Sequence, residues 1–491
     1  MKVRISRFDP QKDSEPHIET YDVTVSAGAR VLNVLDAVRD TIDPALGYRH
    51  CCRGGQCGSC AVRVNGEPVL ACMHEAADGD LVEPLNLPRI RDLITDIAPV
   101  IARLAWLNSG DDCGACHLVT ADDVEAMKPL RECIECYSCI SACPAIEAST
   151  YAGPTIMRQQ MRLNLDPRDA GDRVTEAIEK GLFSCTTCRK CVEVCPKNID
   201  TPRKAVEKLR EQAVRRGLCL PAHKSLAALI EATGRSVERK EPTFLERVPE
   251  VIEPDGRAGA RRTVGFFVGC MFNARVVQPA LDAMELLKRN GIRIIIPKTQ
   301  VCCGSPLIRT GFTGFIPELQ ARNIAAFTAA GVDTVLTMCA GCGSTLKHDY
   351  KTPFRVVDIT EFLAELGFEM PAKVPGIYTY HDPCHLLRGQ GISKQPRELL
   401  SAAAETFVDM PARCCGAGGG VKSGQPEEAA KIGAARAEMV KQTGAEYIVT
   451  VCPFCEFHLH QVTGLPVKNI ATLMMEGYKK KDEENSTQMR I

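Results

Sequence analysis

Hydrophobic and polar residues alternate at every second position near the start of the chain. This period of two covers residues 2–8 and 21–25, and it is typical of strands with one buried face. Apolar residues at helical spacing follow at 31–40, after a Ser26-Ala27-Gly28 sequence that predicts a turn. Residues 1–100 are therefore expected to form one small domain of strands with a helix.

Strands and helices alternate regularly from residue 262 onward. The apolar runs that predict strands are 263–268, 292–296, 334–337, 377–380 and 447–451. The segments that predict helices are 276–289, 318–330, 397–404 and 429–443. Such alternation favours α/β layers around a parallel sheet. A sheet of this kind binds its ligands at the carboxyl ends of its strands.

Ten cysteines of this α/β region form a pattern that occurs twice. Each copy has one Cys, then Cys-Cys-Gly, then Cys-x-x-Cys, and equivalent cysteines lie 112 to 114 residues apart. This fixed offset indicates a duplicated unit. Loops that bring many thiolates together usually bind a soft metal, most often zinc or iron–sulfur. The first copy, within 262–375, contains Cys270, Cys302, Cys303, Cys339 and Cys342, and the second, within 376–478, contains Cys384, Cys414, Cys415, Cys452 and Cys455.

A second group of cysteines lies in the N-terminal domain. Its spacing is Cys52-x4-Cys57-x2-Cys60, with Cys72 further along, and this is the plant-type ferredoxin spacing for a [2Fe–2S] cluster. Glycines between these cysteines let the backbone wrap closely around a cluster. We interpret Cys51 as a neighbouring thiol that is not a ligand.

Residues 101–234 predict a helical domain with two similar cysteine runs. Both runs read Cys-x2-Cys-x2-Cys-x3-Cys-Pro, the spacing of bacterial two-cluster ferredoxins, in which the fourth cysteine of each run binds the other cluster. One [4Fe–4S] cluster is assigned to Cys133, Cys136, Cys139 and Cys195. The other is assigned to Cys185, Cys188, Cys191 and Cys143. A helix is expected to begin after the capping residue Thr201 and to end at Gly217.

Composition limits the class of protein. A chain of 491 residues predicts about three or four domains, and a net charge of −1 argues against a dedicated nucleic-acid binder. No stretch reaches the ~18 uncharged apolar residues of a membrane span, and residues 1–10 lack the pattern of a signal peptide. With 26 cysteines, we expect a cytoplasmic protein whose thiolates bind metal and do not form a disulfide scaffold.

Two charged segments separate or follow the predicted domains. Residues 235–261 contain several prolines and predict a linker. Residues 479–491 form a charged tail that is expected to be disordered.

Three further features of the sequence resemble known motifs or involve cysteine, but they do not change the predicted function. Cys113-Gly114-Ala115-Cys116-His117 matches the pattern for c-type haem attachment, but nothing else supports export, so a thiol pair or an additional metal contact is favoured. Cys219 is interpreted as an ordinary buried thiol. The glycine-rich run at 416–423 comes close to a phosphate loop, but Val421 stands where that loop requires glycine, so nucleotide binding is rejected.

The duplicated pattern resembles the cysteine-rich CCG domain of heterodisulfide reductase catalytic subunits and of the iron–sulfur subunits of glycolate and lactate oxidases. This resemblance implies a non-cubane [4Fe–4S] cluster on each copy. The stretch from Cys52 to Ala61 resembles the β-grasp ferredoxin domain of succinate dehydrogenase and fumarate reductase iron–sulfur subunits. Those subunits usually lack a residue equivalent to Cys188 and carry a [3Fe–4S] centre there. The presence of Cys188 therefore predicts a four-iron cluster that passes electrons to the CCG domains.

Together these modules resemble the iron–sulfur subunits of the thiol:fumarate reductases of methanogens. The expected fold is multidomain α+β: a β-grasp [2Fe–2S] ferredoxin, an α-helical two-cluster ferredoxin and duplicated α/β CCG domains. The resemblance implies oxidation of the coenzyme M and coenzyme B thiols to their heterodisulfide at the CCG clusters. Electrons would then pass to a partner flavoprotein, which carries the FAD and reduces fumarate to succinate.

Candidate catalytic residues follow from this resemblance and from their positions near the CCG cysteines in the sequence. Cys303 and Cys415 are expected to act in thiol chemistry, and His381 and His385 are candidates for handling protons. His348 is a further candidate, and Arg388 and Lys422 are candidates for binding anionic groups. The alternative function is an electron-transfer subunit of a succinate dehydrogenase or 2-hydroxy-acid oxidoreductase without its own thiol site. A structural zinc module is rejected, because both ferredoxin-like modules match the spacing of succinate dehydrogenase iron–sulfur subunits.

Overall fold

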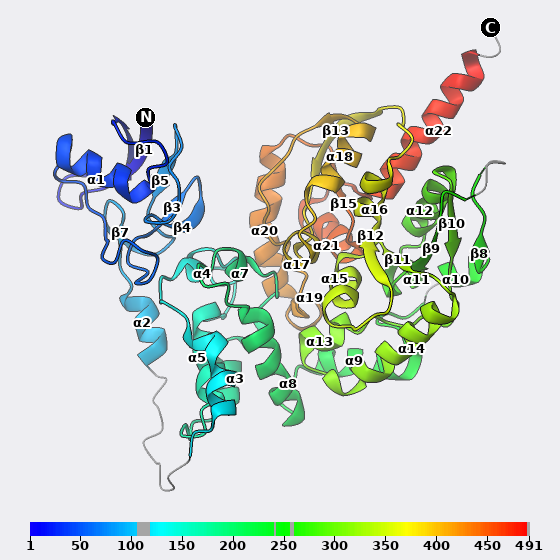
Figure 1. The fold of residues 1–491 in the computed structure, drawn as a ribbon, viewed down its shortest axis with the longest axis horizontal. Helices are drawn as coiled ribbons and strands as arrows, with labels where there is room; N and C mark the ends of the chain where they lie inside the picture. The colour runs from blue at the N-terminus through cyan, green and yellow to red at the C-terminus, as the bar shows by residue number, and fades with distance from the viewer. Residues whose placement is uncertain (106–117, 240–241, 256–259, 489–491) are drawn as a thin grey trace. The chain divides into compact units, whose positions relative to one another are not determined.

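A computed structural model describes residues 1–105, 118–239, 242–255 and 260–488 of the chain. These residues form two compact units, each drawn in Figure 1. Unit 1 consists of Met1–Leu182 and Arg189–Leu209, and unit 2 consists of Phe183–Cys188 and Arg210–Ile491. The haem-like sequence at 113–117 lies outside the described residues.

Unit 1 begins with a five-stranded mixed sheet of order β2-β1-β5-β3-β4. Its β1 pairs antiparallel with β2 and parallel with β5. The strands are β1 (Lys2–Arg7), β2 (His17–Asp22), β3 (Ala61–Val64), β4 (Glu67–Leu70) and β5 (Leu81–Glu83), followed by the hairpin β6 (Arg89–Arg91) and β7 (Ile94–Thr95).

One helix packs on the sheet of unit 1. Helix α1 (Val31–Thr41) buries five apolar side chains at helical spacing against the sheet. The strand expected at 2–8 and the helix expected at 31–40 are thereby confirmed. The strand expected at 21–25 is shifted instead, because β2 pairs with β1 only as far as Asp22.

The remainder of unit 1 is helical, as the sequence predicts. Its elements are α2 (Ala98–Ala105), α3 (Ala121–Arg131), α4 (Ser138–Ser141), α5 (Pro154–Asn164), α6 (Arg173–Glu179), α7 (Lys190–Glu193) and η2 (Pro202–Val206). Helix α8 (Glu207–Arg215) continues from η2, and its residues from Arg210 onward belong to unit 2. The expectation that Thr201 caps this last helix is wrong. Thr201 has helical backbone angles and makes no capping hydrogen bond with its side chain, because η2 opens as a π-helical turn.

Unit 2 contains two sheets whose parallel strands have the same order, and the first sheet has one additional edge strand, β8. The first has the order β12-β11-β9-β10-β8 and the second has the order β14-β13-β15-β16. All neighbours are parallel except β8. The strands are β8 (Val251–Ile252), β9 (Arg262–Phe267), β10 (Ile292–Ile295), β11 (Thr334–Thr337), β12 (Arg355–Asp358), β13 (Val374–Tyr380), β14 (Ala404–Phe407), β15 (Tyr447–Thr450) and β16 (Val467–Asn469).

Helices connect the parallel strands, so the predicted alternation of strands and helices is confirmed. One hydrophobic core runs through both sheets of unit 2. The helices are α9 (Pro221–Thr233), α10 (Phe244–Arg247), α11 (Cys270–Ala274), α12 (Gln278–Arg289), α13 (Ser305–Thr310), α14 (Ile316–Ala329), α15 (Ala340–His348), α16 (Ile359–Leu366), α17 (Cys384–Gln390), α18 (Lys394–Ala403), α19 (Val421–Gly424), α20 (Pro426–Gln442), α21 (Pro453–Thr463) and α22 (Ile470–Gln488).

The structure differs from the sequence expectations in two connecting segments. The segment expected as a linker, 235–261, contributes α10 and also β8, which pairs antiparallel with β10 because Val251 and Ile252 extend the edge of the first sheet. The segment 210–234, expected in the helical ferredoxin domain, belongs to unit 2.

The expectation of a disordered tail is wrong for residues 479–488, which continue α22 (red in Figure 1). The charges of this segment have partners on unit 2. Asp482 pairs with Arg289 at 2.7 Å, and Lys481 pairs with Glu369 at 3.2 Å. Helix α22 packs on α12 of the first copy and on α18 of the second.

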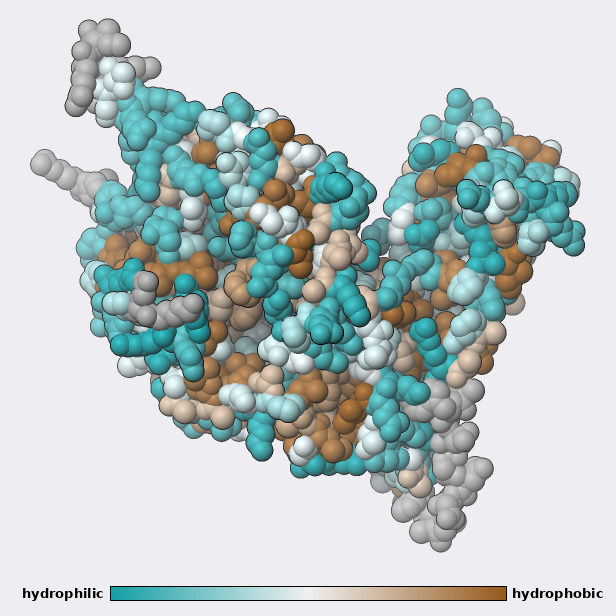
Figure 2. All heavy atoms as spheres, turned by 180° about the vertical axis from the view of Figure 1, so that it is seen from behind, coloured by the Kyte–Doolittle hydropathy of each residue, from teal (hydrophilic) through white to brown (hydrophobic). Residues whose placement is uncertain are grey.

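The surface carries both hydrophobic and hydrophilic side chains. On the face drawn in Figure 2, hydrophobic residues are interspersed with hydrophilic ones. Phe454 and Phe457 on α21 are among the large apolar side chains that remain exposed. Among the helices that the structure describes, none has both the length and the apolar character needed to cross a membrane.

Candidate metal centre

The duplicated cysteines lie where the parallel strands of unit 2 end. Cys270 follows β9 and Cys384 follows β13, while Cys339 and Cys452 follow β11 and β15. Cys339 is the N-cap of α15 and Cys452 is the N-cap of α21. The partial positive charge at a helix N-terminus favours thiolate over thiol. The strand–loop–helix pattern therefore places these sulfur atoms at helix N-termini. The pKa of Cys339 is lowered, whereas its hydrogen bond with Cys339 raises the pKa of Cys452.

Both copies face one shared cavity of about 340 Å³. All ten cysteines of the duplicated pattern line it. Eight of them are buried, and Cys270 and Cys384 are half-buried. All are free thiols, so no disulfide competes for these sulfur atoms within the described residues. The structure thus brings together the two sets of five cysteines that the sequence assigned to separate copies.

The thiols of the cavity form one continuous series of contacts. The sulfur atoms of Cys415 and Cys455 lie 3.6 Å apart. The two copies meet where the thiols of Cys339 and Cys452 hydrogen-bond each other. In order of contact the series is Cys270, Cys302, Cys303, Cys342, Cys339, Cys452, Cys455, Cys415, Cys414, Cys384 and Cys188.

Cys303 and Cys415 are the one pair of equivalent cysteines, among the ten that line the cavity, in which the pKa of both thiols is lowered. A hydrogen bond from Cys302 lowers the pKa of Cys303 well below its usual value. A hydrogen bond from Cys414 does the same for the pKa of Cys415. Hydrogen bonds that favour the charged form lower the pKa of a thiol. These shifts favour the thiolate form of both cysteines, and their catalytic role remains a prediction from the sequence.

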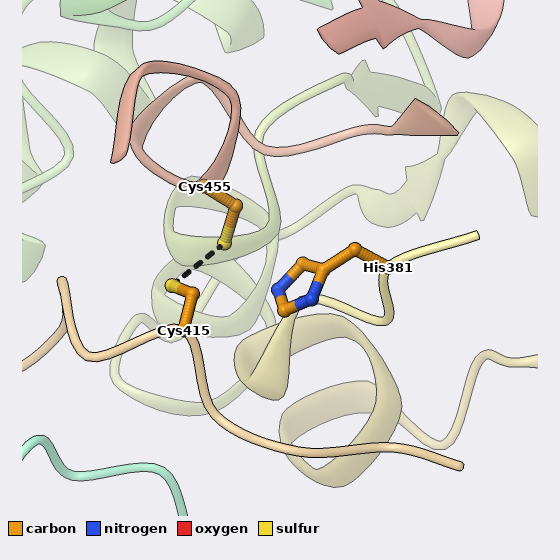
Figure 3. Close-up of side chains that lie close together, drawn as sticks. All are labelled: His381, Cys415 and Cys455. Carbon is orange, nitrogen blue, oxygen red and sulfur yellow. Dashed lines mark hydrogen bonds between the residues drawn. The ribbon is translucent and has the colours of Figure 1, made fainter. Parts of the chain in front are cut away.

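His381 lies beside the second set of thiols, as Figure 3 shows. Its ring nitrogen and the sulfur atoms of Cys415 and Cys455 lie within 4.8 Å of one another. The ring is fully buried, and burial followed by the nearby charge of Arg436 lowers the pKa of His381 well below its usual value. His381 is therefore a neutral group beside Cys415 and Cys455, although it is not among the residues that line the cavity.

The other proposed side chains are placed differently. His385 lines the cavity, and its Nε2 lies 3.3 Å from the carbonyl oxygen of Thr187. Lys422 also lines the cavity. His348 is exposed, with its Nε2 2.7 Å from the carbonyl oxygen of Gly389. Arg388 is not among the lining residues, and its Nη1 lies 3.7 Å from the sulfur of Cys384.

Sequence reasoning missed two residues of this site. Arg436 is fully buried on α20 and contacts His381, although it stands far from any cysteine in the sequence. Cys188 contacts the thiols of Cys384 and Cys414, although its spacing assigns it to a ferredoxin run. The sequence near Arg436 or Cys188 does not predict these contacts, because each contact joins two segments that only folding brings together.

The predicted [2Fe–2S] ligands lie close together in unit 1. The sulfur of Cys52 accepts hydrogen bonds from the backbone N–H groups of Gln56 and Cys57, both at 3.3 Å. The thiols of Cys60 and Cys72 hydrogen-bond each other. A hydrogen bond from Ser59 lowers the pKa of Cys57 to about 6. A loop that points N–H groups at a ligand sulfur fits an iron–sulfur cluster, whose sulfurs accept such bonds.

The first predicted [4Fe–4S] set is also brought together in unit 1. Cys139 interacts electrostatically with Cys133, Cys136 and Cys195, as expected if the fourth ligand comes from the other run. Gly58 allows the [2Fe–2S] loop to approach this set, since a Cβ there would lie 2.9 Å from the Cβ of Cys136.

The second predicted [4Fe–4S] set is divided between the units. Cys143 and Cys191 belong to unit 1, and Cys185 and Cys188 belong to unit 2. This ligand set remains a prediction from the spacing.

The glycine-rich run at 416–420 has a structural role in unit 2. Gly419 has a φ of +63°, and a Cβ there would lie 2.4 Å from the carbonyl oxygen of Cys185. The run therefore lets the loop of Cys185 and Cys188 pack directly against the second copy. The close approach accounts for these glycines without a bound phosphate.

Replacement of Cys188 by serine is expected to convert the second ferredoxin-type cluster into a [3Fe–4S] centre, because one of its four thiolate ligands is lost. Electron paramagnetic resonance (EPR) spectra of the mildly oxidised chain would show the new three-iron signal. An unchanged set of four-iron signals, or loss of iron only from the CCG cavity, would instead assign Cys188 to the series of thiols that it contacts.

Three family models match the chain, in the order expected from the cysteine spacings. A 2Fe-2S iron-sulfur cluster binding domain matches residues 2–102. A 4Fe-4S dicluster domain matches residues 129–199. A cysteine-rich domain, the CCG domain, matches twice, at 264–347 and 378–460.

Known proteins resemble the chain over most of its length. It is 42% identical over 470 residues to the B subunit of the fumarate reductase (CoM/CoB) of Methanothermobacter marburgensis, and the match covers 94% of each chain. It is 31% identical over 368 residues to the D subunit of the dihydromethanophenazine:CoB–CoM heterodisulfide reductase of Methanosarcina barkeri, covering 67% of this chain and 88% of that one. A crystal structure of a hypothetical protein from Helicobacter pylori shares the fold, with a TM-score of 0.59, 14% identity, and coverage of 97% of this chain and 94% of that chain.

Proposed function

The chain belongs to the family of fumarate reductase (CoM/CoB) B subunits and is an iron–sulfur, electron-transfer subunit of an oxidoreductase; from this premise we propose that it oxidises two thiols to a disulfide in the CCG cavity. The two thiols are those of coenzyme M and coenzyme B. The electrons leave through the ferredoxin clusters to a flavoprotein subunit that carries FAD and reduces fumarate to succinate.

The observation that carries this proposal is the single cavity shared by both copies. Joining two thiols releases two protons and two electrons, and reducing fumarate to succinate consumes both. Two iron–sulfur clusters held by these ten thiolates would each take up one electron. A protein that only transferred electrons would need no common chamber between two clusters, whereas a chamber lined by both cysteine sets accommodates two sulfur substrates at once.

The walls of the cavity suit anionic thiols. Lys422 lines the cavity. Its ammonium group can form charge-assisted hydrogen bonds to a sulfonate, phosphate or carboxylate of the substrate. Met271 and Phe454 contribute apolar side chains to the wall of the cavity. His385 on the same wall is placed to receive a proton from a substrate thiol.

The remaining clusters form the route out of the cavity in this proposal. The chain would hold one [2Fe–2S] cluster, two [4Fe–4S] clusters and two non-cubane [4Fe–4S] clusters. The close approach at Gly58 supports transfer between the [2Fe–2S] loop and the first [4Fe–4S] set. The contacts of Cys188 with Cys384 and Cys414 support a junction between the second ferredoxin run and the second CCG copy.

An assay with both coenzymes tests the proposal. The reconstituted chain is combined with its flavoprotein partner, and fumarate consumption is followed with coenzyme M and coenzyme B thiols as the only electron donors. We expect one succinate and one heterodisulfide per pair of thiols, and no turnover with either thiol alone. Fumarate reduction by a reduced dye without any reduction by the thiols would favour a subunit that only transfers electrons.

A further inference from the structure

The two CCG copies differ in the residue that precedes the first cysteine by three places. This residue is His381 in the second copy and Phe267 in the first. Both are buried and lie at the carboxyl end of equivalent strands, β13 and β9. Phe267 contacts the ring of Phe327, with ring centroids 6.1 Å apart. The first copy therefore has an apolar side chain where the second copy has an imidazole.

Arg436 fixes the orientation and the tautomer of this imidazole. Its Nε donates a hydrogen bond of 3.2 Å to Nδ1 of His381. A guanidinium has only donors, so Nδ1 must be the unprotonated acceptor and the single proton of the neutral ring lies on Nε2. In the described part of the chain this Nε2 has no hydrogen-bond partner.

The remaining contacts of Arg436 leave its charge without a carboxylate hydrogen-bond partner in the described residues. Its other oxygen partners are the carbonyl groups of Pro411 and Tyr380. The nearby carboxylate of Asp382 is held by Arg397, with both oxygens at 2.8 Å. In the first copy, the residues 112 to 114 positions before Arg436 are Ile324, Asn323 and Arg322. The cation among them, Arg322, is exposed and pairs with Glu318 at 3.7 Å.

We propose that Arg436 is a positioning residue that holds His381 as a neutral Nε2–H donor toward the sulfur atoms of the second CCG site. The inference rests on the proposed binding of an iron–sulfur cluster in each copy. Hydrogen bonds to the sulfurs and nearby positive charge stabilise the reduced, more negative cluster. The second cluster therefore has the higher reduction potential, and the two clusters accept electrons unequally. An Nε2 that carries its proton has no lone pair for iron, so His381 is not a ligand.

The test is a redox titration of the reconstituted full chain, followed by EPR. The signal of the second site is identified by its loss in Cys415→Ala. His381→Phe places the first-copy residue in the second copy. At a fixed potential, we expect this variant to lower the ratio of reduced to oxidised cluster at the second site at least tenfold. For one electron, this is a fall of about 59 mV in midpoint potential. The first site should not change, and neither should the exposed-site control His348→Phe.

Two further variants separate positioning from folding. Arg436→Met removes the hydrogen bond to Nδ1 and should shift the second midpoint in the same direction. His381→Gln keeps an N–H donor and should restore part of the potential that His381→Phe loses. Iron content per chain is measured for every variant.

Each outcome decides one point. A wild-type chain that binds no iron in the CCG cavity would overturn the proposed function. Normal iron content with equal midpoints at the two sites, or with no shift in His381→Phe, would overturn the inference alone. Loss of the second cluster in both His381→Phe and His381→Gln would make His381 a ligand and would also overturn it.

Discussion

Replacing Cys303 or Cys415 by alanine is expected to abolish fumarate reduction driven by thiols, while reduction driven by an artificial donor through the ferredoxin clusters and the flavoprotein continues. The loss should exceed the roughly 10–100-fold that follows removal of an outer partner of a metal ligand. Each substitution removes one of the five thiolates of its copy.

The position of these two thiols explains the size of the effect. Cys303 and Cys415 stand at equivalent points of the series of sulfur contacts, and hydrogen bonds from their neighbours lower the pKa of both thiols well below the usual value. Loss of either breaks the series on one side of the Cys339–Cys452 contact, where the copies meet. Because two electrons must leave together for a disulfide to form, one intact copy is not sufficient.

The measurement compares two donors in the same preparation. Fumarate reduction is followed first with the two thiols and then with a reduced dye. Cys219→Ala is the matched control, because Cys219 is a half-buried thiol of unit 2 that is not among the residues lining the cavity. If both Cys303→Ala and Cys415→Ala kept thiol-driven activity near that of the wild type, the thiols would be oxidised at a site other than the CCG cavity.

Replacing Arg210 by alanine is expected to destabilise unit 2 by more than about 3 kcal/mol, because hydrogen bonds to a charged group contribute about 1.5–3 kcal/mol each. The guanidinium is fully buried and donates to three carbonyl oxygens, those of Arg309 at 2.6 Å and of Gly419 and Cys185 at 2.8 Å. These acceptors belong to both CCG copies and to the 183–188 segment. Removing Arg210 leaves them buried without their donor.

Hydrogen exchange read by mass spectrometry measures this effect locally. Peptides that contain residues 183–188 and 416–420 should exchange about a hundredfold faster or more. Arg215→Ala on the same helix is the control: its exposed side chain pairs with Glu211, and a surface pair of this kind contributes less than about 1 kcal/mol. Equal exchange in the two variants would show that Arg210 does not hold these segments.

The cysteine pattern predicted most of the candidate site because, in the sequence, each cysteine lies next to the strand that positions it. The strands that end before Cys270, Cys339, Cys384 and Cys452 are short apolar runs, and a parallel sheet gathers such strand ends at one edge. The duplicated spacing then predicted two equivalent copies, and the structure gives both sheets the same strand order.

The contacts that make the two copies unequal are not local. Arg436 reaches His381 across 55 residues, and Arg210 reaches Gly419 across 209. A buried arginine and a surface arginine look the same in sequence, since either can lie on an amphipathic helix. The same limit explains the tail at 479–488, where a charged composition suggested disorder but the charges pair with Arg289 and Glu369 on the folded unit.

Helix α22 has a consequence for the order of assembly. It follows every strand of both sheets in the chain, yet it joins the copies: Thr472 donates a hydrogen bond of 2.7 Å to Asp282 on α12, while the same helix packs on α18. Domains generally fold during synthesis from the N-terminal side. Earlier elements of the two copies already contact each other, as α15 does α17 and α16 does α18, but the contacts between the copies are complete only when α22 has emerged from the ribosome.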